Sequence, residues 1–141
     1  MKKNQILLVE DNEGDIVLTS EAFEDCGSNI ELQIARNGKE AINILFDQND
    51  ESLLPDLILL DINLPLLNGH EVLKKIKENT KTKHIPVVIL TTSSAMSDIN
   101  LTYENHANCF ITKPADINDF FETINVLSNY WFKFCKLPAN K

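Results

Sequence analysis

The stretch Leu57-Ile58-Leu59-Leu60-Asp61-Ile62-Asn63 decides the fold, because it joins an unbroken apolar run to an acid. Strands that are covered on both faces of a parallel sheet have such runs, without alternation of polar and apolar residues. Three further runs have the same character, namely Ile6–Val9, Val87–Leu90 and Cys109–Ile111. A fifth segment, Ile30–Ala35, does alternate, which predicts an edge strand with one face in water.

Segments with apolar residues at helical spacing lie between these runs. They cover Asp15–Asp25, Gly38–Asp47, Gly69–Glu78, Ser97–His106 and the stretch from Asp116 onward. Alternating strands and helices predict an α/β protein, and right-handed crossovers restrict its topology. We therefore predict a flavodoxin-like (βα)5 three-layer sandwich, whose parallel five-stranded sheet has the order 2-1-3-4-5. It forms a single domain over residues 1–141, with a long polar loop at 47–55 and an extended C-terminal helix and tail at about 116–141.

Composition excludes several classes of partner. The 141 residues carry a formal net charge of -8, which opposes binding to nucleic acid and to anionic membrane surfaces. No apolar run approaches the roughly 20 residues of a membrane span, and the first one is too short for a signal peptide, so we expect a cytoplasmic protein. The three cysteines, Cys26, Cys109 and Cys135, are widely spaced, which predicts buried thiols rather than a disulfide or a zinc site.

Chemically active side chains follow four of the predicted strands. Glu10-Asp11-Asn12 follows the first strand, Asp61-Ile62-Asn63 the third, Thr91-Thr92-Ser93-Ser94 the fourth and Thr112-Lys113-Pro114 the fifth. Because functional sites of such sheets lie beyond the carboxyl ends of the strands, these residues should meet at one edge. The plain alternatives are that Asp11 or Asn12 only caps a helix, that the Thr-Ser stretch caps the next one, and that Lys113-Pro114 is only a loop.

Three crowded carboxylates repel one another unless a cation lies among them. Oxygen ligands and an incomplete protein shell suit Mg²⁺, with Mn²⁺ as the alternative metal. Asp11 and Asp61 are the expected direct ligands, a backbone carbonyl near Asn63 adds a third, and Glu10 acts through water. Asp61 is then a candidate nucleophile that forms an aspartyl-phosphate. Lys113 would neutralise the phosphoryl oxygens, and the Thr91 hydroxyl would donate a hydrogen bond to the new group.

The chain resembles the receiver domain of two-component response regulators over nearly its whole length. The matching motifs are Leu8-Val9-Glu10-Asp11-Asn12, Leu59-Leu60-Asp61-Ile62-Asn63-Leu64-Pro65, Asn68-Gly69, Ile85-Pro86-Val87-Val88-Ile89-Leu90-Thr91 and Phe110-Ile111-Thr112-Lys113-Pro114.

The resemblance implies a role for each of these positions. It makes Asp61 the phosphoacceptor, Glu10 and Asp11 the acidic pair that binds Mg²⁺, Lys113 the essential lysine, and Thr91 and Phe110 the residues that switch together. It further implies a cis Lys113–Pro114 bond and a phosphohistidine donor on a sensor histidine kinase.

A narrower resemblance is to the single-domain regulators that are paired with bacterial phytochromes, some of which form homodimers. It rests on Glu10-Asp11-Asn12-Glu13-Gly14-Asp15, the loop before Asp56, His106-Ala107-Asn108-Cys109 and the tail from Tyr130 to Pro138. Phe110 departs from it, because related sequences often have tyrosine there.

The aromatic residues of the tail fall on more than one side of the predicted last helix. Trp131 and Phe134 continue its inward stripe, whereas Tyr130 and Phe132 do not. We expect a homodimer through the last helix and its neighbours, the alternative being that the tail folds back over the body.

Three rival functions make different demands on the sequence. A phosphatase of the haloacid dehalogenase type needs a second carboxylate two residues after its nucleophile, where this chain has Asn63, so we expect no turnover of external substrates. A flavodoxin-like cofactor binder needs a phosphate-binding loop, and Glu10-Asp11 would repel that anion. A receiver domain without phosphorylation should lack a key residue, and none is missing. We expect output through a partner, through dimerisation or through relay of the phosphoryl group.

Overall fold

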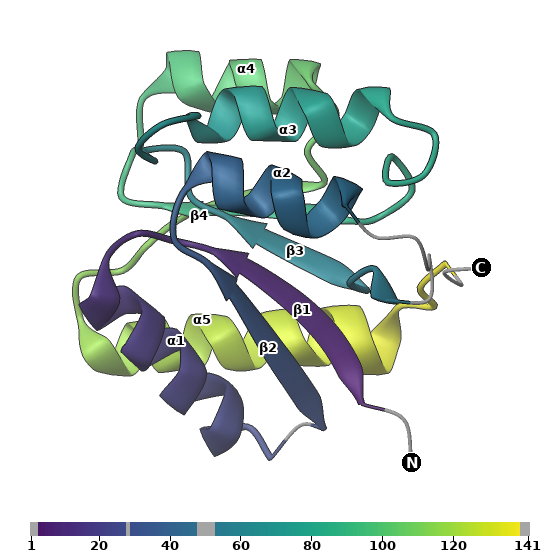
Figure 1. Cartoon of the computed structure of the whole chain (residues 1–141). Coiled ribbons are helices and arrows are strands. Elements are labelled where there is room, and N and C mark those ends of the chain that lie inside the picture. The colour runs from purple at the N-terminus through teal and green to yellow at the C-terminus, as the bar shows by residue number, and fades with distance from the viewer. Residues whose placement is uncertain (1–2, 28, 48–52, 139–141) are drawn as a thin grey trace.

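The computed structural model describes residues 3–27, 29–47 and 53–138, which form a five-stranded parallel sheet with helices on both faces (Figure 1). The strands are β1 (Asn4–Val9), β2 (Ile30–Ala35), β3 (Leu57–Leu60), β4 (Val87–Thr91) and β5 (Cys109–Thr112). Their order is β2-β1-β3-β4-β5, and every neighbouring pair is parallel. The predicted fold class and strand order are confirmed.

The helices alternate with the strands along the chain. They are α1 (Glu13–Asp25), α2 (Gly38–Phe46), α3 (Gly69–Glu78), α4 (Met96–Glu104) and α5 (Ile117–Asn129). Helices α1 and α5 cover one face of the sheet, and α2, α3 and α4 lie on the other (Figure 1). All five helices were predicted. For α1 to α4, the predicted and the observed ends differ by no more than two residues.

The sheet separates two apolar clusters because successive side chains of a strand point to opposite faces. In β1, Leu7 and Val9 pack toward α2 and α3, whereas Ile6 and Leu8 pack toward α1 and α5. β3 is fully buried along its length, as its unbroken apolar run predicts. β2 alternates between half-buried and exposed residues over its first five positions, which confirms it as an edge strand.

Four helix N-termini at the carboxyl edge of the sheet are capped by short polar side chains. The side-chain oxygens of Asn12, Asn37, Asn68 and Asp116 accept hydrogen bonds from backbone amides three residues further on. Such caps satisfy amides that have no partner within the helix. Helix α4 differs, because it begins after Ala95 without a side-chain cap.

A single π-helical turn, Tyr130–Phe134, continues α5. The Cys135 amide donates to the Tyr130 carbonyl at 2.9 Å, which closes the wider turn. Trp131 and Phe132 pack against the α1–α5 side of the core, whereas Phe134 is 79% exposed. The predicted inward stripe was therefore wrong for Phe134 and Phe132, because residues of a π turn rotate less about the axis than those of an α-helix.

Two further predictions need correction or qualification. The three cysteines are free but only half-buried, rather than buried, because Cys109 lies on an edge strand and the other two follow helix ends. Most of the predicted loop at 47–55 lies outside the described residues.

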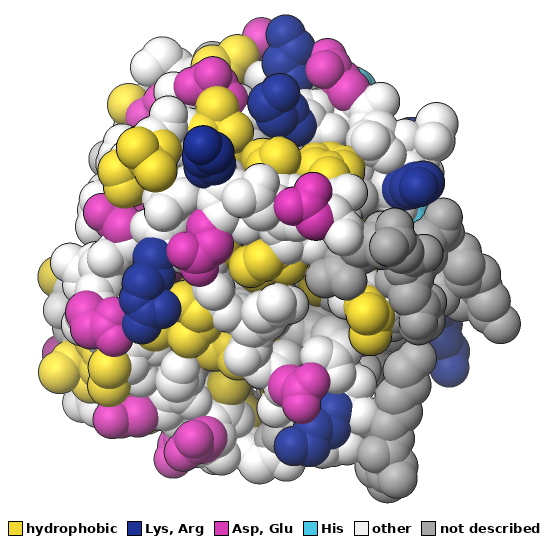
Figure 2. Space-filling model, viewed as in Figure 1, with side chains coloured by type: hydrophobic (Ala, Val, Ile, Leu, Met, Phe, Trp, Pro, Cys, Tyr) yellow, Lys and Arg dark blue, Asp and Glu magenta, His cyan; other side chains and the backbone are white. Residues whose placement is uncertain are grey.

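The surface drawn in Figure 2 has acidic and basic side chains interspersed rather than gathered into separate patches. Within the described part of the chain, none of the helices combines the length and the apolar character that crossing a membrane requires.

Candidate functional site

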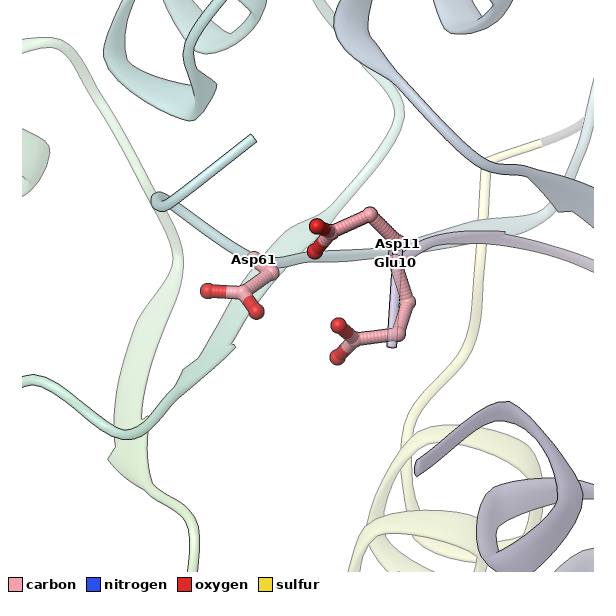
Figure 3. A group of neighbouring side chains, drawn as sticks. All are labelled: Glu10, Asp11 and Asp61. Carbon is pink, nitrogen blue, oxygen red and sulfur yellow. The ribbon is translucent and has the colours of Figure 1, made fainter. Parts of the chain in front are cut away.

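Three carboxylates meet where β1 and β3 end (Figure 3). Glu10 and Asp11 follow β1, Asp61 follows β3, and their side chains point toward a common space. One oxygen of each carboxylate lies within 4.8 Å of one oxygen of the others. Glu10 and Asp61 are buried, whereas Asp11 is exposed. The expected convergence of acids at this edge is therefore present.

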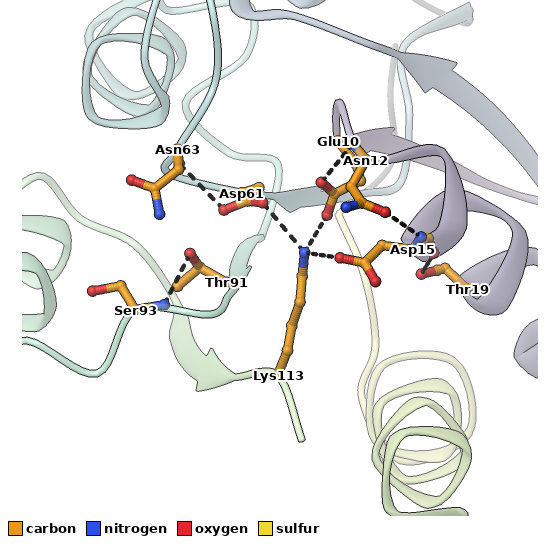
Figure 4. Close-up of polar contacts among 9 residues, drawn as sticks. All are labelled: Glu10, Asn12, Asp15, Thr19, Asp61, Asn63, Thr91, Ser93 and Lys113. Atoms are coloured by element: carbon orange, nitrogen blue, oxygen red, sulfur yellow. Dashed lines mark hydrogen bonds and ion pairs between the residues drawn. The ribbon is translucent and has the colours of Figure 1, made fainter. Parts of the chain in front are cut away.

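Lys113 reaches this cluster from the end of β5 (Figure 4). Its Nζ donates to the Glu10 carboxylate, to Asp15 Oδ2 at 2.9 Å and to Asp61 Oδ2 at 3.2 Å. The lysine side chain is only 6% exposed, so water screens these contacts little. One ammonium group thus faces three carboxylates, and the site has an excess of negative charge.

This crowding shifts the pKa values of both Glu10 and Lys113. Burial is the main cause that raises the pKa of Glu10 to about 7, and the charge of Asp61 adds to it, although Lys113 acts in the opposite direction. Burial alone would lower the pKa of Lys113, but hydrogen bonds to Glu10 and Asp15 together with the charge of Asp61 raise it above its ordinary value. Lys113 is therefore a fixed positive charge at neutral pH.

Asp15 is a member of the site that the sequence did not reveal. It lies in the first turn of α1, where its amide donates to the Asn12 side chain while its carboxylate accepts from Lys113. Acids are common in first turns because they interact favourably with the helix dipole, so the pattern alone indicated a helix start. The available signal was its position one helical turn after the acidic pair.

The structure shows which of Asp11 and Asn12 caps the first helix: it is Asn12. Its side chain caps α1, and its amide donates to Glu10 Oε2 at 3.1 Å, so it also helps to position that carboxylate. Asp11 is not the cap, and its carboxylate remains directed at the cluster.

The backbone around Asp61 is held from two sides. The Asn63 amide donates to Asp61 Oδ1 at 3.2 Å. Gly69, at the start of α3, packs so closely that a Cβ there would lie 2.3 Å from the Asp61 carbonyl oxygen and 2.5 Å from Ile62 Cα. Only glycine permits this approach, which explains why the Asn68-Gly69 pair follows the acid at this distance in the chain.

Thr91 and Phe110 lie on neighbouring strands behind the carboxylates. Thr91 is fully buried at the end of β4, and its hydroxyl accepts from the Ser93 amide at 3.4 Å. Phe110 in β5 is half-buried against the α2–α3 side of the core, and its amide donates to the Tyr103 hydroxyl of α4 at 3.2 Å. The two predicted switch residues therefore belong to adjacent strands that reach the same edge.

The expected cis bond before Pro114 is wrong, because the described residues contain no cis peptide bond. The trans form of an X–Pro bond is favoured by about 0.5–1 kcal/mol, so the local sequence does not demand the cis form. The Lys113 amide donates to the Thr91 carbonyl at 2.6 Å, which orients the lysine across the end of the sheet in the trans arrangement.

The donor set suits a hard divalent cation. Carboxylate oxygens are ligands that Mg²⁺ and Mn²⁺ prefer, and each of the three acids can supply one. Asn63 follows Asp61 closely enough in the chain for its backbone to border the same space. The residues present therefore fit the predicted cation.

The fold and this edge of the sheet define a class of signalling protein, and residues 6–125 match the family described as the response regulator receiver domain. The chain belongs to that family.

The response regulator Rcp1 of Synechocystis sp. is 42% identical over 136 residues, which cover 95% of this chain and 92% of Rcp1. The structure of the phosphorylated cyanobacterial phytochrome response regulator RcpA has a TM-score of 0.92 and 39% identity, with 98% of this chain and 100% of that chain covered. The Mn²⁺-bound form of Rcp1 has a TM-score of 0.90 and 41% identity, covering 96% and 99%. The chain is thus related to phytochrome response regulators.

Proposed function

We propose that this chain is a phosphorylation switch that accepts a phosphoryl group on Asp61 from a sensor histidine kinase. One observation supports it above all: the Asp61 carboxylate, beside two further acids, lies 3.2 Å from the Nζ of a buried lysine that reaches it from β5. A single fixed cation next to a nucleophilic carboxylate is the arrangement that stabilises incoming phosphoryl oxygens. A purely structural ion pair would not need three acids around one lysine.

The reaction transfers a phosphoryl group between two side chains. An Asp61 oxygen attacks phosphorus and forms an acyl phosphate, while the bond from phosphorus to the donor imidazole nitrogen breaks and that nitrogen keeps the electron pair. Lys113 carries its positive charge toward the transferred oxygens and gives up part of its contact with Glu10 and Asp15. Asn63 keeps Asp61 oriented through its amide.

Glu10, Asp11, Asp61 and the backbone carbonyl of Asn63 would hold Mg²⁺, with Mn²⁺ as an alternative. When bound, the cation would balance the negative charge of the acids and polarise the phosphoryl oxygens. The Mn²⁺-bound form of the relative Rcp1 and the carboxylate cluster of this chain support this assignment.

The conformational response would begin at Thr91. Its hydroxyl would leave the Ser93 amide and donate to the phosphoryl group, and Phe110 would move into the space behind it. Partner binding or dimerisation would change as a result. The backbone amide of Phe110 donates to the Tyr103 hydroxyl of α4, so a shift of the β5 backbone at this position would also displace that helix.

Phosphate affinity gels after incubation with acetyl phosphate and Mg²⁺ test the acceptor. We expect one shifted band with the wild type and none with Asp61→Asn. For Lys113→Met, we expect a shifted band that is strongly reduced. A shift that survives Asp61→Asn would refute Asp61 as the acceptor. Because Asn63 replaces the acid that a phosphatase would need, we also expect no sustained hydrolysis of p-nitrophenyl phosphate.

The donor is proposed to be a phytochrome-type histidine kinase of the cytoplasm, by analogy with the related regulators Rcp1 and RcpA. Phosphotransfer from purified candidate kinases tests this directly. Rapid transfer from a phytochrome-type kinase is the expected result, and transfer only from kinases of other classes would contradict it.

A homodimer through α5 and its neighbours is the second part of the proposal. A groove of about 810 Å³ lies between β5 and α5. Its apolar lining residues include Cys109, Ile111, Val126, Tyr130 and Trp131, and polar residues, most of them from α5, line the rest. Val126 and Tyr130 are 60% and 53% exposed, and among the strands that the structure describes β5 is an edge strand that pairs with β4 alone. Such a surface is typical of an interface.

Light scattering coupled to gel filtration tests the dimer. Val126→Glu should give a monomer, whereas the control Val17→Glu, which places the same charge at an exposed valine of α1, should not change the mass. Equal masses for both variants and the wild type would exclude this interface.

A further inference from the structure

Three side chains beside the site are not used by the proposed chemistry and form a connected chain of hydrogen bonds. The Ser93 hydroxyl donates to Asp98 Oδ2 at 2.6 Å, and His70 Nε2 donates to Asp98 Oδ1 at 2.9 Å. Ser93 lies in the loop between β4 and α4, Asp98 in the first turn of α4, and His70 in the first turn of α3. These contacts therefore tie the beginnings of two helices to one loop.

One end of this chain is anchored to the phosphoacceptor strand. His70 follows Gly69, whose amide donates to the Ile62 carbonyl at 2.8 Å and at which a Cβ would lie 2.3 Å from the Asp61 carbonyl oxygen. The His70 side chain is 17% exposed. His70 thus has little freedom to move independently of the backbone that carries Asp61.

The other end is anchored to the switch residue. The Ser93 amide donates to the Thr91 hydroxyl, as drawn in Figure 4, and the Thr112 hydroxyl donates to the Ser93 carbonyl at 3.0 Å. Amide, hydroxyl and carbonyl of Ser93 are therefore all engaged. A movement of Thr91 toward Asp61 breaks its contact with Ser93, while Asp98 still holds the Ser93 side chain in place.

The charge on Asp98 strengthens both contacts. Hydrogen bonds first from Ser93 and then from His70 lower the pKa of Asp98, so it is an ionised acceptor at neutral pH. An acid in the first turn of α4 is also favourable for the helix by itself. That alternative, however, does not account for a half-buried histidine from another helix, whose Nδ1 is buried without a hydrogen-bond partner in the described residues.

We propose that Ser93, Asp98 and His70 form a latch that holds the β4–α4 loop in the arrangement of the unphosphorylated protein. They are positioning residues, because none of them contacts the carboxylate cluster. The latch opposes the movement of Thr91 and so sets how readily Asp61 becomes phosphorylated. It rests on the proposed function for its effect on phosphorylation, but its effect on the loop is independent of that function.

Two variants open the latch at different points. Asp98→Ala removes both contacts, and His70→Phe keeps a planar ring in place while it removes the Nε2 donor and the unpaired Nδ1. The matched control is Glu40→Ala, because Glu40 occupies in α2 the same first-turn position that Asp98 occupies in α4. It therefore reproduces the loss of a favourable helix charge without touching the latch.

The first measurement is hydrogen exchange of the loop at residues 92–98 in the unphosphorylated, metal-free protein. A net hydrogen bond is worth about 0.5–1.5 kcal/mol, so exchange should be about two- to tenfold faster in Asp98→Ala and His70→Phe and unchanged in the control. The second is the rate of phosphorylation by acetyl phosphate, which should rise by about the same factor in the same two variants.

Two readouts separate a latch from simple structural damage. The Mg²⁺ affinity by calorimetry should stay within about twofold of the wild type in all variants, because the carboxylates are untouched. The double variant His70→Phe/Asp98→Ala should behave like Asp98→Ala alone, because both changes break the same contact.

The outcomes distinguish failure of the latch from failure of the proposed function. Unchanged loop exchange, or a phosphorylation rate at or below that of the wild type, would overturn the latch while Asp61 remains the acceptor. Faster loop exchange in a protein that acetyl phosphate never modifies would instead refute the proposed function and leave the latch in place.

Discussion

The buried carboxylate of Glu10 makes the stability of this protein depend on pH in a direction opposite to most ion-paired acids. The change to be tested is Glu10→Gln, which resembles the protonated side chain in shape and leaves an oxygen to accept from Lys113. The comparison of variant and wild type therefore measures the free energy of ionising Glu10 inside the folded protein.

The magnitude follows from the pKa. Burial, assisted by Asp61, raises the pKa of Glu10 from 4.5 to about 7, and a side chain that is 3% exposed is little screened by water. At 1.36 kcal/mol per pKa unit this corresponds to about 3 kcal/mol. Because the folded protein holds the proton more tightly than the unfolded chain, the contribution is fully present below pH 4.5 and is lost as the pH rises through about 7.

The assay is urea denaturation in EDTA, followed by circular dichroism, at several pH values. Glu10→Gln should be more stable than the wild type by less than about 1 kcal/mol at about pH 5 and by about 3 kcal/mol at about pH 8. The control Glu13→Gln alters an exposed acid and should show a difference that is nearly independent of pH. A Glu10→Gln difference that is constant with pH, or a variant less stable than the wild type at about pH 8, would refute the reasoning.

Three further expectations concern the same edge of the sheet. The Mg²⁺ affinity of the wild type should increase between about pH 6 and about pH 8, because Glu10 must lose its proton for the cluster to reach full charge; calorimetry that finds no dependence on pH would contradict this. Lys113→Met leaves three carboxylates without their counter-charge, so its free energy of unfolding in EDTA at about pH 8 should fall by about 3 kcal/mol, and Mg²⁺ should stabilise it more than it stabilises the wild type. Gly69→Ala places a Cβ against the Asp61 carbonyl and should cost about 1–3 kcal/mol in urea denaturation, whereas the control Gly14→Ala, whose Cβ would meet only the Asn12 side chain at 3.2 Å, should cost less than half as much.

The strands and their order were predictable because burial on both faces leaves little choice of residue type. β3 and β4 are buried at every position, and their apolar runs carry that information without ambiguity. The alternation in β2 identified the edge in the same way. The strand order determines which strand ends lie together at the carboxyl edge of the sheet. It therefore also predicted that Glu10, Asp61 and Lys113 lie close to one another.

What the sequence could not supply depends on exact geometry. Asp15 joins the site only because the first turn of α1 points its carboxylate at Lys113, and an acid in a first turn has a simpler explanation. The latch residue His70 has no pattern of its own, since its partner lies 28 residues away on another helix. Phe134 was placed wrongly because constant helical periodicity was assumed through a segment that changes to a π turn.

That π turn has a consequence for how the end of the chain is specified. A π turn has the effect of one extra residue in an otherwise regular helix. Removal of a single residue between Tyr130 and Phe134 would restore a regular α-helix and leave Phe134 on its present outward side, because the wider turn already accommodates the extra residue. In a chain of the same length with a regular α-helix here, the residue at position 134 would be rotated by about a quarter of a turn toward the core and would no longer be presented to a partner. The outward position of Phe134 therefore depends on the presence of the π turn as much as on the residue type.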